Sequence, residues 1–357
     1  MGTAGSASSH DVALLRLAAQ RLVGPPPETA GEAVRWLTAV QGQDLPGALL
    51  SVALRTRRRS RADVEAALGS GDVVRTWPMR GTLHLVAAED AGWLLRLLAP
   101  RVVVRSAGRR ASLGLTEDDA ARAREVSAQV LGGGARLTRP ELLAAWQAAG
   151  VETGGQRGAH LLSLTAMGGT IVQGPLRDGQ QLYVLTDGWV QAPRRLEGDE
   201  ALGELALRYL RSHGPATALD LRRWAGLLAG EARTAIALAR PQLLAIDVGG
   251  VEHLMDPGTP DRLAAARESA DGVLLLPGFD ELVLGYADRS ASLDPRFADR
   301  ICPGSNGMFR PTVVSGGQVV GTWARCGRGG REITATPFTS FTADVEAAVP
   351  LAHAALP

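Results

Sequence analysis

Two glutamines separated by one residue are the side chains whose type and spacing most directly indicate a chemistry in this sequence. Gln41 and Gln43 flank Gly42. An amide does not titrate, so the pair cannot serve as a general acid and a general base. Each amide donates and accepts hydrogen bonds, so two of them can hold one water molecule in a fixed orientation. In an extended segment, residues i and i+2 point the same way, so both amides could face one cleft.

A second segment, about forty residues later, indicates a partner for this chemistry. Residues 75–86 read RTWPMRGTLHLV, which predicts a hairpin with a basic tip. Arg75 and Arg80 are its candidate DNA contacts, and Arg80 at the turn is suited to a phosphate. His84 lies on the second strand, and a lone His is usually structural. A purely structural hairpin is the alternative, just as the glutamines could be polar caps of a helix end. A water-orienting pair beside a nucleic-acid reader indicates hydrolysis of a bond in DNA.

Basic charge is concentrated in one part of the chain. The protein has 38 basic and 37 acidic residues, so its net charge of +1 says nothing about a polyanionic partner. Residues 51–110 alone hold twelve Arg against five acidic residues, a local charge of +7. Such a region is typical of a phosphate-binding face, and a solvated charged surface is the alternative. Arg57, Arg58 and Arg59 follow a predicted helix in this region and are further candidate DNA contacts.

Missing and rare residues exclude several classes of protein. The sequence contains no Lys, so no side-chain Schiff base can form. Cys302 and Cys326 have no His nearby at ligand spacing and make neither a zinc motif nor a disulfide framework. We therefore expect no metal and no cofactor. No apolar stretch approaches the roughly 18 residues of a membrane span, and no signal peptide is recognisable, which predicts a cytoplasmic protein.

Helical and strand patterns position these residues. Helical patterns at 32–41 and 48–55 leave the Gln pair near a helix end, and a helix at 61–68 precedes the hairpin. The order recurs after Thr138, which with Glu141 forms a capping signature and is followed by a helix and two strands. It recurs again from Asp199, with a hairpin formed by residues 243–247 and 251–255.

Helices followed by a hairpin predict an α+β fold of tandem winged-helix (helix-turn-helix) domains with a small β-rich C-terminal domain. A terminal helix is expected at 343–355, with Pro350 as a candidate interruption. Most of the seven tryptophans are expected in cores. We expect a first winged helix with the Gln pair and connecting helices at 10–135, a second at 136–192, a third at 199–258, and the β-rich domain at 271–357.

The chain resembles the winged-helix DNA glycosylase family that includes the azinomycin-resistance enzyme AlkZ and the bacterial protein YcaQ. The resemblance runs from about Leu14 to about Trp323. It rests on QGQ at 41–43, WPMRGTLH at 77–84, LLPGFDELVLGYADR at 275–289, NG at 306–307 and VVGTW at 319–323. Family members usually have an aliphatic residue where this chain has Gly42, and the YcaQ-like members have Asp in place of Gln43.

The resemblance implies a monomeric, monofunctional DNA glycosylase that removes N7-alkylated purines from double-stranded DNA, with Gln41 and Gln43 as catalytic residues. It also implies that the strand of His84 lies near the Gln pair, which makes His84 a candidate contact to the DNA or the lesion. Alkylation at N7 gives the base a positive charge, so it leaves as a neutral species with little acid assistance. Placing water under C1′ is the remaining task, and neutral dipoles can do that. The azinomycin-type relatives imply bulky adducts or interstrand crosslinks as substrates, in alkylation-damage repair or antibiotic self-resistance.

Two carboxylates and one other function stay open as alternatives. Asp44 adjoins Gln43 and is a candidate to support the pair without touching the substrate. Asp280 lies in an apolar run and is a rival catalyst, because most glycosylases place a carboxylate near C1′; its alternative role is to bind loop amides. The rival function is a non-enzymatic winged-helix DNA-binding transcriptional regulator, although the chain offers no coiled coil and no obvious ligand motif.

The absence of Lys predicts the product of base excision. The protein should leave an intact abasic strand until alkali or heat is applied, because no side chain can form the Schiff base that lyase chemistry needs. Borohydride treatment during the reaction should therefore trap no covalent protein–DNA complex. A trapped complex that survives blocking of the N-terminal amine would contradict this expectation.

Overall fold

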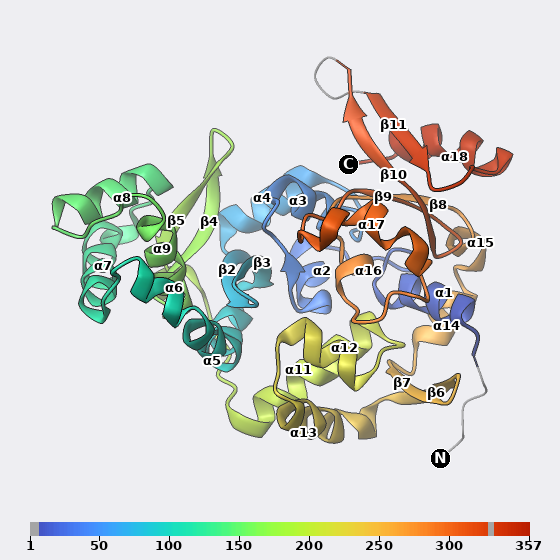
Figure 1. The fold of residues 1–357 in the computed structure, drawn as a ribbon, viewed down its shortest axis with the longest axis horizontal. Helices are drawn as coiled ribbons and strands as arrows, with labels where there is room; N and C mark the ends of the chain where they lie inside the picture. The colour runs from blue at the N-terminus through green and yellow to red at the C-terminus, as the bar shows by residue number, and fades with distance from the viewer. Residues whose placement is uncertain (1–6, 328–331) are drawn as a thin grey trace. The chain divides into compact units, whose positions relative to one another are not determined.

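The computed structural model describes residues 7–327 and 332–357 and divides the chain into two compact units (Figure 1). One unit combines residues 1–61 with 202–357, and the other comprises residues 62–201. Both contain helices and antiparallel sheets, so the fold is α+β as expected. The four domain boundaries expected from the sequence are not tested by this division and stay predictions.

The N-terminal part of the first unit begins with two short helices that have N-terminal capping boxes. Ser8 caps α1 (Ser9–Ala19) and Thr29 caps α2 (Ala30–Leu37), each through a reciprocal capping box. The helix expected to reach Gln41 ends at Leu37, so that expectation was wrong. Thr38 adopts a φ of 70°, which a β-branched residue rarely does, and this conformation cannot continue a helix. The chain instead enters the two-residue strand β1 (Val40–Gln41) and then α3 (Leu45–Ala53).

The middle of the first unit contains the expected third hairpin. Thr217 caps α12 through a capping box with Asp220. Ala216, just before that cap, forms an isolated antiparallel bridge with Leu254 in the second strand of the hairpin. The elements are α11 (Gly198–His213), α12 (Ala218–Ala225), α13 (Ala229–Ala239), β6 (Leu244–Val248), β7 (Val251–Met255), α14 (Thr259–Ala264) and α15 (Arg267–Ala270).

The C-terminal part is β-rich as expected and forms an antiparallel sheet of order β11-β10-β9-β8. Its strands are β8 (Val273–Leu276), β9 (Thr312–Ser315), β10 (Gln318–Cys326) and β11 (Glu332–Pro337). The short helices α16 (Glu281–Leu284) and α17 (Ala298–Ile301) lie between β8 and β9, and α18 (Ala343–Ala354) runs through Pro350 without interruption. Buried Leu14, Leu275 and Val313 belong to the apolar core that joins this sheet to α1.

The second unit is built around a sheet in which four strands have the order β3-β2-β4-β5. Both hairpins form as expected: Arg80 and Gly81, each with positive φ, turn between β2 and β3, and Asp178 and Gly179 turn between β4 and β5. The elements are α4 (Arg61–Ser70), β2 (Val73–Met79), β3 (Thr82–Ala87), α5 (Ala88–Arg105), α6 (Ala107–Ser112), α7 (Glu117–Val130), α8 (Arg139–Ala148), α9 (Arg157–Met167), β4 (Ile171–Arg177), β5 (Gln180–Leu185) and α10 (Thr186–Trp189).

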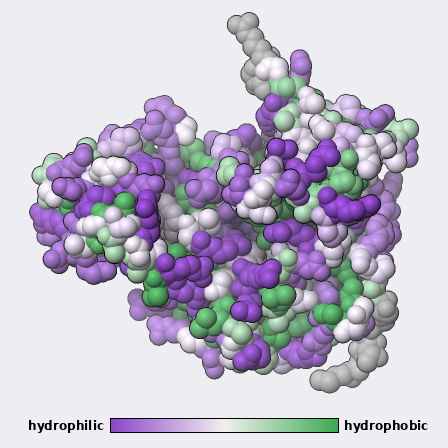
Figure 2. All heavy atoms as spheres, viewed as in Figure 1, coloured by the Kyte–Doolittle hydropathy of each residue, from purple (hydrophilic) through white to green (hydrophobic). Residues whose placement is uncertain are grey.

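The length and apolar character of a helix determine whether it can cross a membrane. Over the described ranges, no helix combines the length and apolar character needed to cross a membrane. Hydrophilic residues predominate on the face shown in Figure 2, and hydrophobic residues form small groups among them.

A buried ion pair fixes α16 to the helical part of the first unit. Arg55, just after α3, and Asp280, the N-cap of α16, are each 1% exposed. Arg55 Nη1 and Nη2 donate to the two oxygens of Asp280 at 2.8 Å each. Ser51 Oγ and the Leu282 amide donate to the same carboxylate, and Gln20 accepts from the Arg55 guanidinium. Such complete hydrogen bonding is what a buried charge pair requires.

Removal of one partner should therefore destabilise the first unit strongly. Asp280→Ala should lower the free energy of unfolding by about 3–5 kcal/mol, because Arg55 would remain buried without a carboxylate. Urea denaturation followed by tryptophan fluorescence measures this. Arg296→Ala, which removes the exposed ion pair with Asp294, should unfold at the parental urea concentration. Equal midpoints for the two variants would show that the buried pair contributes no special stability.

Candidate functional site

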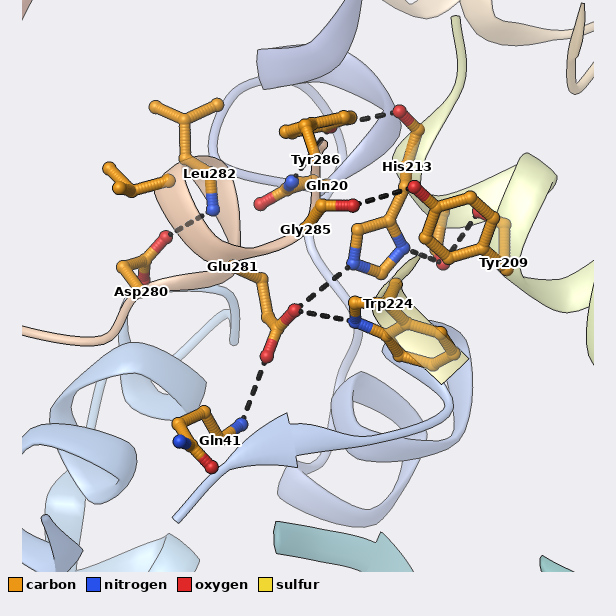
Figure 3. Close-up of polar contacts among 12 residues, drawn as sticks. Gln20, Gln41, Tyr209, His213, Trp224, Asp280, Glu281, Leu282, Gly285 and Tyr286 are labelled. Carbon is orange, nitrogen blue, oxygen red and sulfur yellow. Dashed lines mark hydrogen bonds and ion pairs between the residues drawn. The ribbon is translucent and has the colours of Figure 1, made fainter. Parts of the chain in front are cut away.

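Gln41 combines an anchored main chain with an unpaired side-chain oxygen. It ends β1 and is 8% exposed. Its main-chain N–H donates to Glu281 Oε1 at 3.0 Å (Figure 3). Its own side-chain Oε1 is buried and accepts no hydrogen bond from any residue within 7–327 and 332–357. A buried acceptor left without a partner costs about 1–3 kcal/mol, so such atoms normally bind water or a ligand.

Gln43 and Asp44 lie in a bend directly after β1 and are exposed. The extended geometry that would project both glutamine side chains to one side therefore does not continue to Gln43, and the two amides differ in burial. Asp44 occupies the N-cap position of α3 without a side-chain cap hydrogen bond. A Cβ atom on Gly47 would lie 2.5 Å from Asp44 Oδ2, so the absence of a side chain at Gly47 gives this carboxylate its place.

Glu281 is the functional candidate that the sequence reasoning missed. It is the first residue of α16 and is fully buried. While Oε1 accepts from Gln41, Oε2 accepts from Trp224 Nε1 at 3.0 Å and lies 3.4 Å from His213 Nε2 (Figure 3). The only signal was the pair of carboxylates in an apolar run. Asp280 was favoured there, but Arg55, Ser51 and the Leu282 amide engage both of its oxygens.

His213 lies in a closed aromatic and polar environment behind Glu281. Its ring stacks on Tyr209 with centroids 4.7 Å apart. Ser212 Oγ donates to Arg208 O at 2.8 Å, so this hydroxyl accepts from His213 Nδ1, which lies 2.8 Å away. The Nδ1 atom therefore carries a proton, and Nε2 is the nitrogen that faces Glu281.

Two tyrosines complete this environment as hydrogen-bond donors. Tyr209 Oη donates to Gly285 O at 2.6 Å, and Tyr286 Oη donates to His213 O at 2.8 Å. Gln20 Nε2 donates to Tyr286 Oη. Burial raises the pKa of both Tyr209 and Tyr286 well above the usual range, so both phenols stay protonated at neutral pH.

The β2–β3 hairpin assigns different environments to its three candidate DNA contacts. Arg75 is 9% exposed, and its Nη1 donates to Gln173 Oε1 at 2.8 Å and Gln181 Oε1 at 2.9 Å. Arg80 Nη2 lies 3.1 Å from Nε2 of the fully buried His84. A guanidinium only donates, so His84 Nε2 accepts and its Nδ1–H donates to Thr82 O. The Arg75 contacts connect strands, whereas Arg80 stands at the turn.

Arg57, Arg58 and Arg59 follow α3 and are exposed, as a phosphate-contacting segment would be. Arg57 forms an ion pair with the equally exposed Glu28 at 2.5 Å. Although Arg59 is exposed overall, desolvation of the part of its side chain that packs against the protein lowers the pKa of its guanidinium, and its φ is 47°. Their expected contacts with DNA stay predictions.

Residues suited to hold a metal do not gather in the described part of the chain. No group of three or more His, Cys, Asp or Glu with metal-binding geometry occurs among residues 7–327 and 332–357. Cys302 and Cys326 are both free.

Comparisons with known proteins agree on one family. A family model described as DNA glycosylase AlkZ-like matches residues 34–356. An interstrand DNA cross-link repair glycosylase of Streptomyces sahachiroi is 30% identical over 347 residues, which cover 93% of this chain and 91% of that protein. The solved structure of Streptomyces sahachiroi DNA glycosylase AlkZ aligns with a TM-score of 0.81 and 28% identity, covering 97% of this chain and 95% of that one.

The different environments of Arg80 and Arg75 predict different consequences of their removal. If Arg80 contacts one phosphate, Arg80→Ala should make the dependence of log K on log salt shallower by about one unit in duplex titrations. Arg75→Ala should leave that slope unchanged but lower the free energy of unfolding by roughly 1–3 kcal/mol, because Gln173 and Gln181 lose their shared donor. If only Arg75→Ala changed the dependence of log K on log salt, Arg75 would be the phosphate contact and Arg80 the structural residue.

Proposed function

The chain belongs to the AlkZ-like DNA glycosylase family, and we propose that it hydrolyses the N-glycosidic bond of N7-alkylated purines in double-stranded DNA. The observation that carries this proposal is the state of Gln41. Its main chain is held by a buried carboxylate, while its side-chain oxygen is buried and accepts no hydrogen bond from a described residue. A water molecule is the simplest donor for such an oxygen.

In the proposed reaction, Gln41 accepts a hydrogen bond from the attacking water and Gln43 completes its orientation. The water oxygen bonds to C1′ as the bond from C1′ to the base breaks. The electron pair of that bond leaves with the base, and the excess proton of the water passes to solvent, because neither amide titrates. The positive charge of an N7-alkylated purine is neutralised as the base departs, so the protein need not donate a proton to it. Positioning and preorganised dipoles then supply most of the acceleration.

The remaining predicted residues have supporting roles in this proposal. Arg57, Arg58, Arg59 and Arg80 contact phosphates. His84, expected to contact DNA or the lesion, is fully buried, so its contribution to DNA binding goes through Arg80, which it holds at Nε2. Asp44 supports the bend that carries Gln43. Asp280 has a supporting role through its pairing with Arg55. Direct participation in the hydrolysis would require both of its oxygens to leave their present hydrogen-bond donors.

The relative from Streptomyces sahachiroi is named for interstrand cross-link repair, and we extend that substrate class to this chain. Bulky adducts or interstrand crosslinks of a genotoxic natural product would be substrates, in a setting of antibiotic self-resistance. A crosslinked guanine cannot easily be flipped into a closed pocket, so the substrate would have to be attacked without full extrusion. We further propose a monomeric, monofunctional and cytoplasmic enzyme.

Tandem winged helices are the architecture that we propose for DNA binding. Two segments share an order of helix, bridge residue, two helices and hairpin. In α7–β5, Leu137 forms the bridge to Tyr183; in α11–β7, Ala216 forms the bridge to Leu254. This repetition supports a second and a third winged helix near the expected boundaries.

The Gln pair provides the test of this function. The parental protein should release 7-methylguanine from duplex DNA, detected as alkali-labile sites, and Gln41→Ala and Gln43→Ala should each slow the single-turnover rate by tens- to thousands-fold. The double variant should be little worse than either single variant, because half of a water site places water poorly. DNA affinity should change little.

Gln43→Asp supplies the matched comparison, since it reproduces the YcaQ-like arrangement and should retain more activity than Gln43→Ala. Parental rates in both Ala variants would refute the water site. If the parental protein binds duplex DNA but excises nothing from methylated or crosslinked substrates, the regulator function replaces this proposal.

A further inference from the structure

We propose that Glu281 is a positioning residue for the attacking water, acting through the main chain of Gln41. This inference rests on the proposed function. Glu281 is fully buried and accepts the Gln41 main-chain N–H at 3.0 Å, so it reaches the residue that would hold the water without facing the substrate. The hydrogen bond fixes the point from which the Gln41 side chain extends, and thereby the direction of its unpaired Oε1.

The site requires a carboxylate rather than an amide at position 281. Its two oxygens accept from two different donors, the Gln41 amide on Oε1 and the Trp224 indole on Oε2. A glutamine side chain has one oxygen and one NH₂ group, so it would present a donor to one of these two N–H groups. Glu281→Gln is therefore nearly equal in size but cannot preserve both contacts.

His213 lies next to Glu281 on the side of Oε2. Its Nδ1–H is directed to Ser212, and its Nε2 lies 3.4 Å from Glu281 Oε2. The Gln41 amide and the Trp224 indole supply the hydrogen bonds that a buried carboxylate requires.

His213 and Glu281 lie in a closely packed part of the first unit. A Cβ atom on Gly285 would lie 2.6 Å from both His213 Cδ2 and Glu281 O. His213 is also stacked on Tyr209 and inclined to Trp224 at a centroid distance of 5.4 Å. The packing leaves little room for the His213 ring and the Glu281 main chain to shift, which limits the position from which the Glu281 side chain reaches Gln41.

The test begins with the single-turnover excision of 7-methylguanine from duplex DNA. Glu281→Gln should slow the chemical step by at least about tenfold, since displacements near 1 Å can cost about 100-fold. The dissociation constant for the same duplex should stay within about twofold. An unchanged rate in a folded Glu281→Gln protein would overturn the inference.

Trp224→Phe provides a second variant if Glu281→Gln does not fold. It removes the indole N–H that donates to Oε2 but keeps the Glu281 carboxylate and an aromatic ring at position 224, and it should slow excision as well. Trp323→Phe is its matched control, because Trp323 Nε1 also makes a buried hydrogen bond, to Leu276 O at 2.8 Å, that is unconnected to Glu281. Equal rate losses in the two Trp variants would assign the effect to general destabilisation and overturn the inference.

A double-mutant cycle separates positioning from an independent contribution. If Glu281 acts through Gln41, then Glu281→Gln should cost almost nothing further in a Gln41→Ala background. Rate losses that multiply fully in the double variant would show that Glu281 acts by another route.

Amide hydrogen exchange at Gln41 distinguishes failure of this inference from failure of the proposed function. Exchange of the Gln41 main-chain amide should be slow in the parental protein and faster in Glu281→Gln, whatever the substrate is. If the parental protein is inactive on 7-methylguanine but exchange at Gln41 is faster in Glu281→Gln, the proposed substrate is refuted and the positioning of Gln41 by Glu281 is supported. If exchange at Gln41 is the same in both proteins, the positioning itself is refuted.

Discussion

Burial of two adjacent carboxylates is the constraint on which the organisation of the first unit depends. Asp280 and Glu281 are neighbours in sequence and both are excluded from solvent. Each needs enough donors to offset its loss of hydration, and the two draw these donors from different directions. Asp280 takes them from Arg55, Ser51 and its own helix, whereas Glu281 takes them from β1 and α12 and faces α11. The dipeptide therefore ties together segments that are more than 200 residues apart in the chain.

The local elements were largely predictable from the sequence because their causes are local. The capping box at Thr138 and the hairpins expected after it and at residues 243–255 depend on residues close together in the chain, and they formed as expected. The helix expected to run to Gln41 failed for a local reason of a different kind. The apolar spacing of the predicted helix continues beyond Leu37, but Thr38 adopts a positive φ, which its residue type does not predict.

The buried network could not have been assembled from the sequence. Pairing of Arg55 with Asp280 and of Gln41 with Glu281 joins residues separated by 225 and 240 positions. In the sequence, Arg55 and Arg57 belong to the same basic segment. In the structure, Arg55 is buried and Arg57, two residues later, is exposed. Trp224 was expected only to fill a core, which it does with one atom engaged in a hydrogen bond to Glu281.

The hold on Gln41 uses a main-chain N–H, which every residue except proline possesses. The anchor is therefore indifferent to the side chain that it places. The orientation of the main chain at position 41 is set by Glu281 of α16, and its chemistry is set separately by the side chain of the residue at position 41. A different hydrogen-bonding group introduced at position 41 would inherit the same origin and starting direction. The main-chain position of residue 41 is thus set independently of its side chain, so a substitution at position 41 other than proline can change the side chain while the main-chain contact with Glu281 is kept.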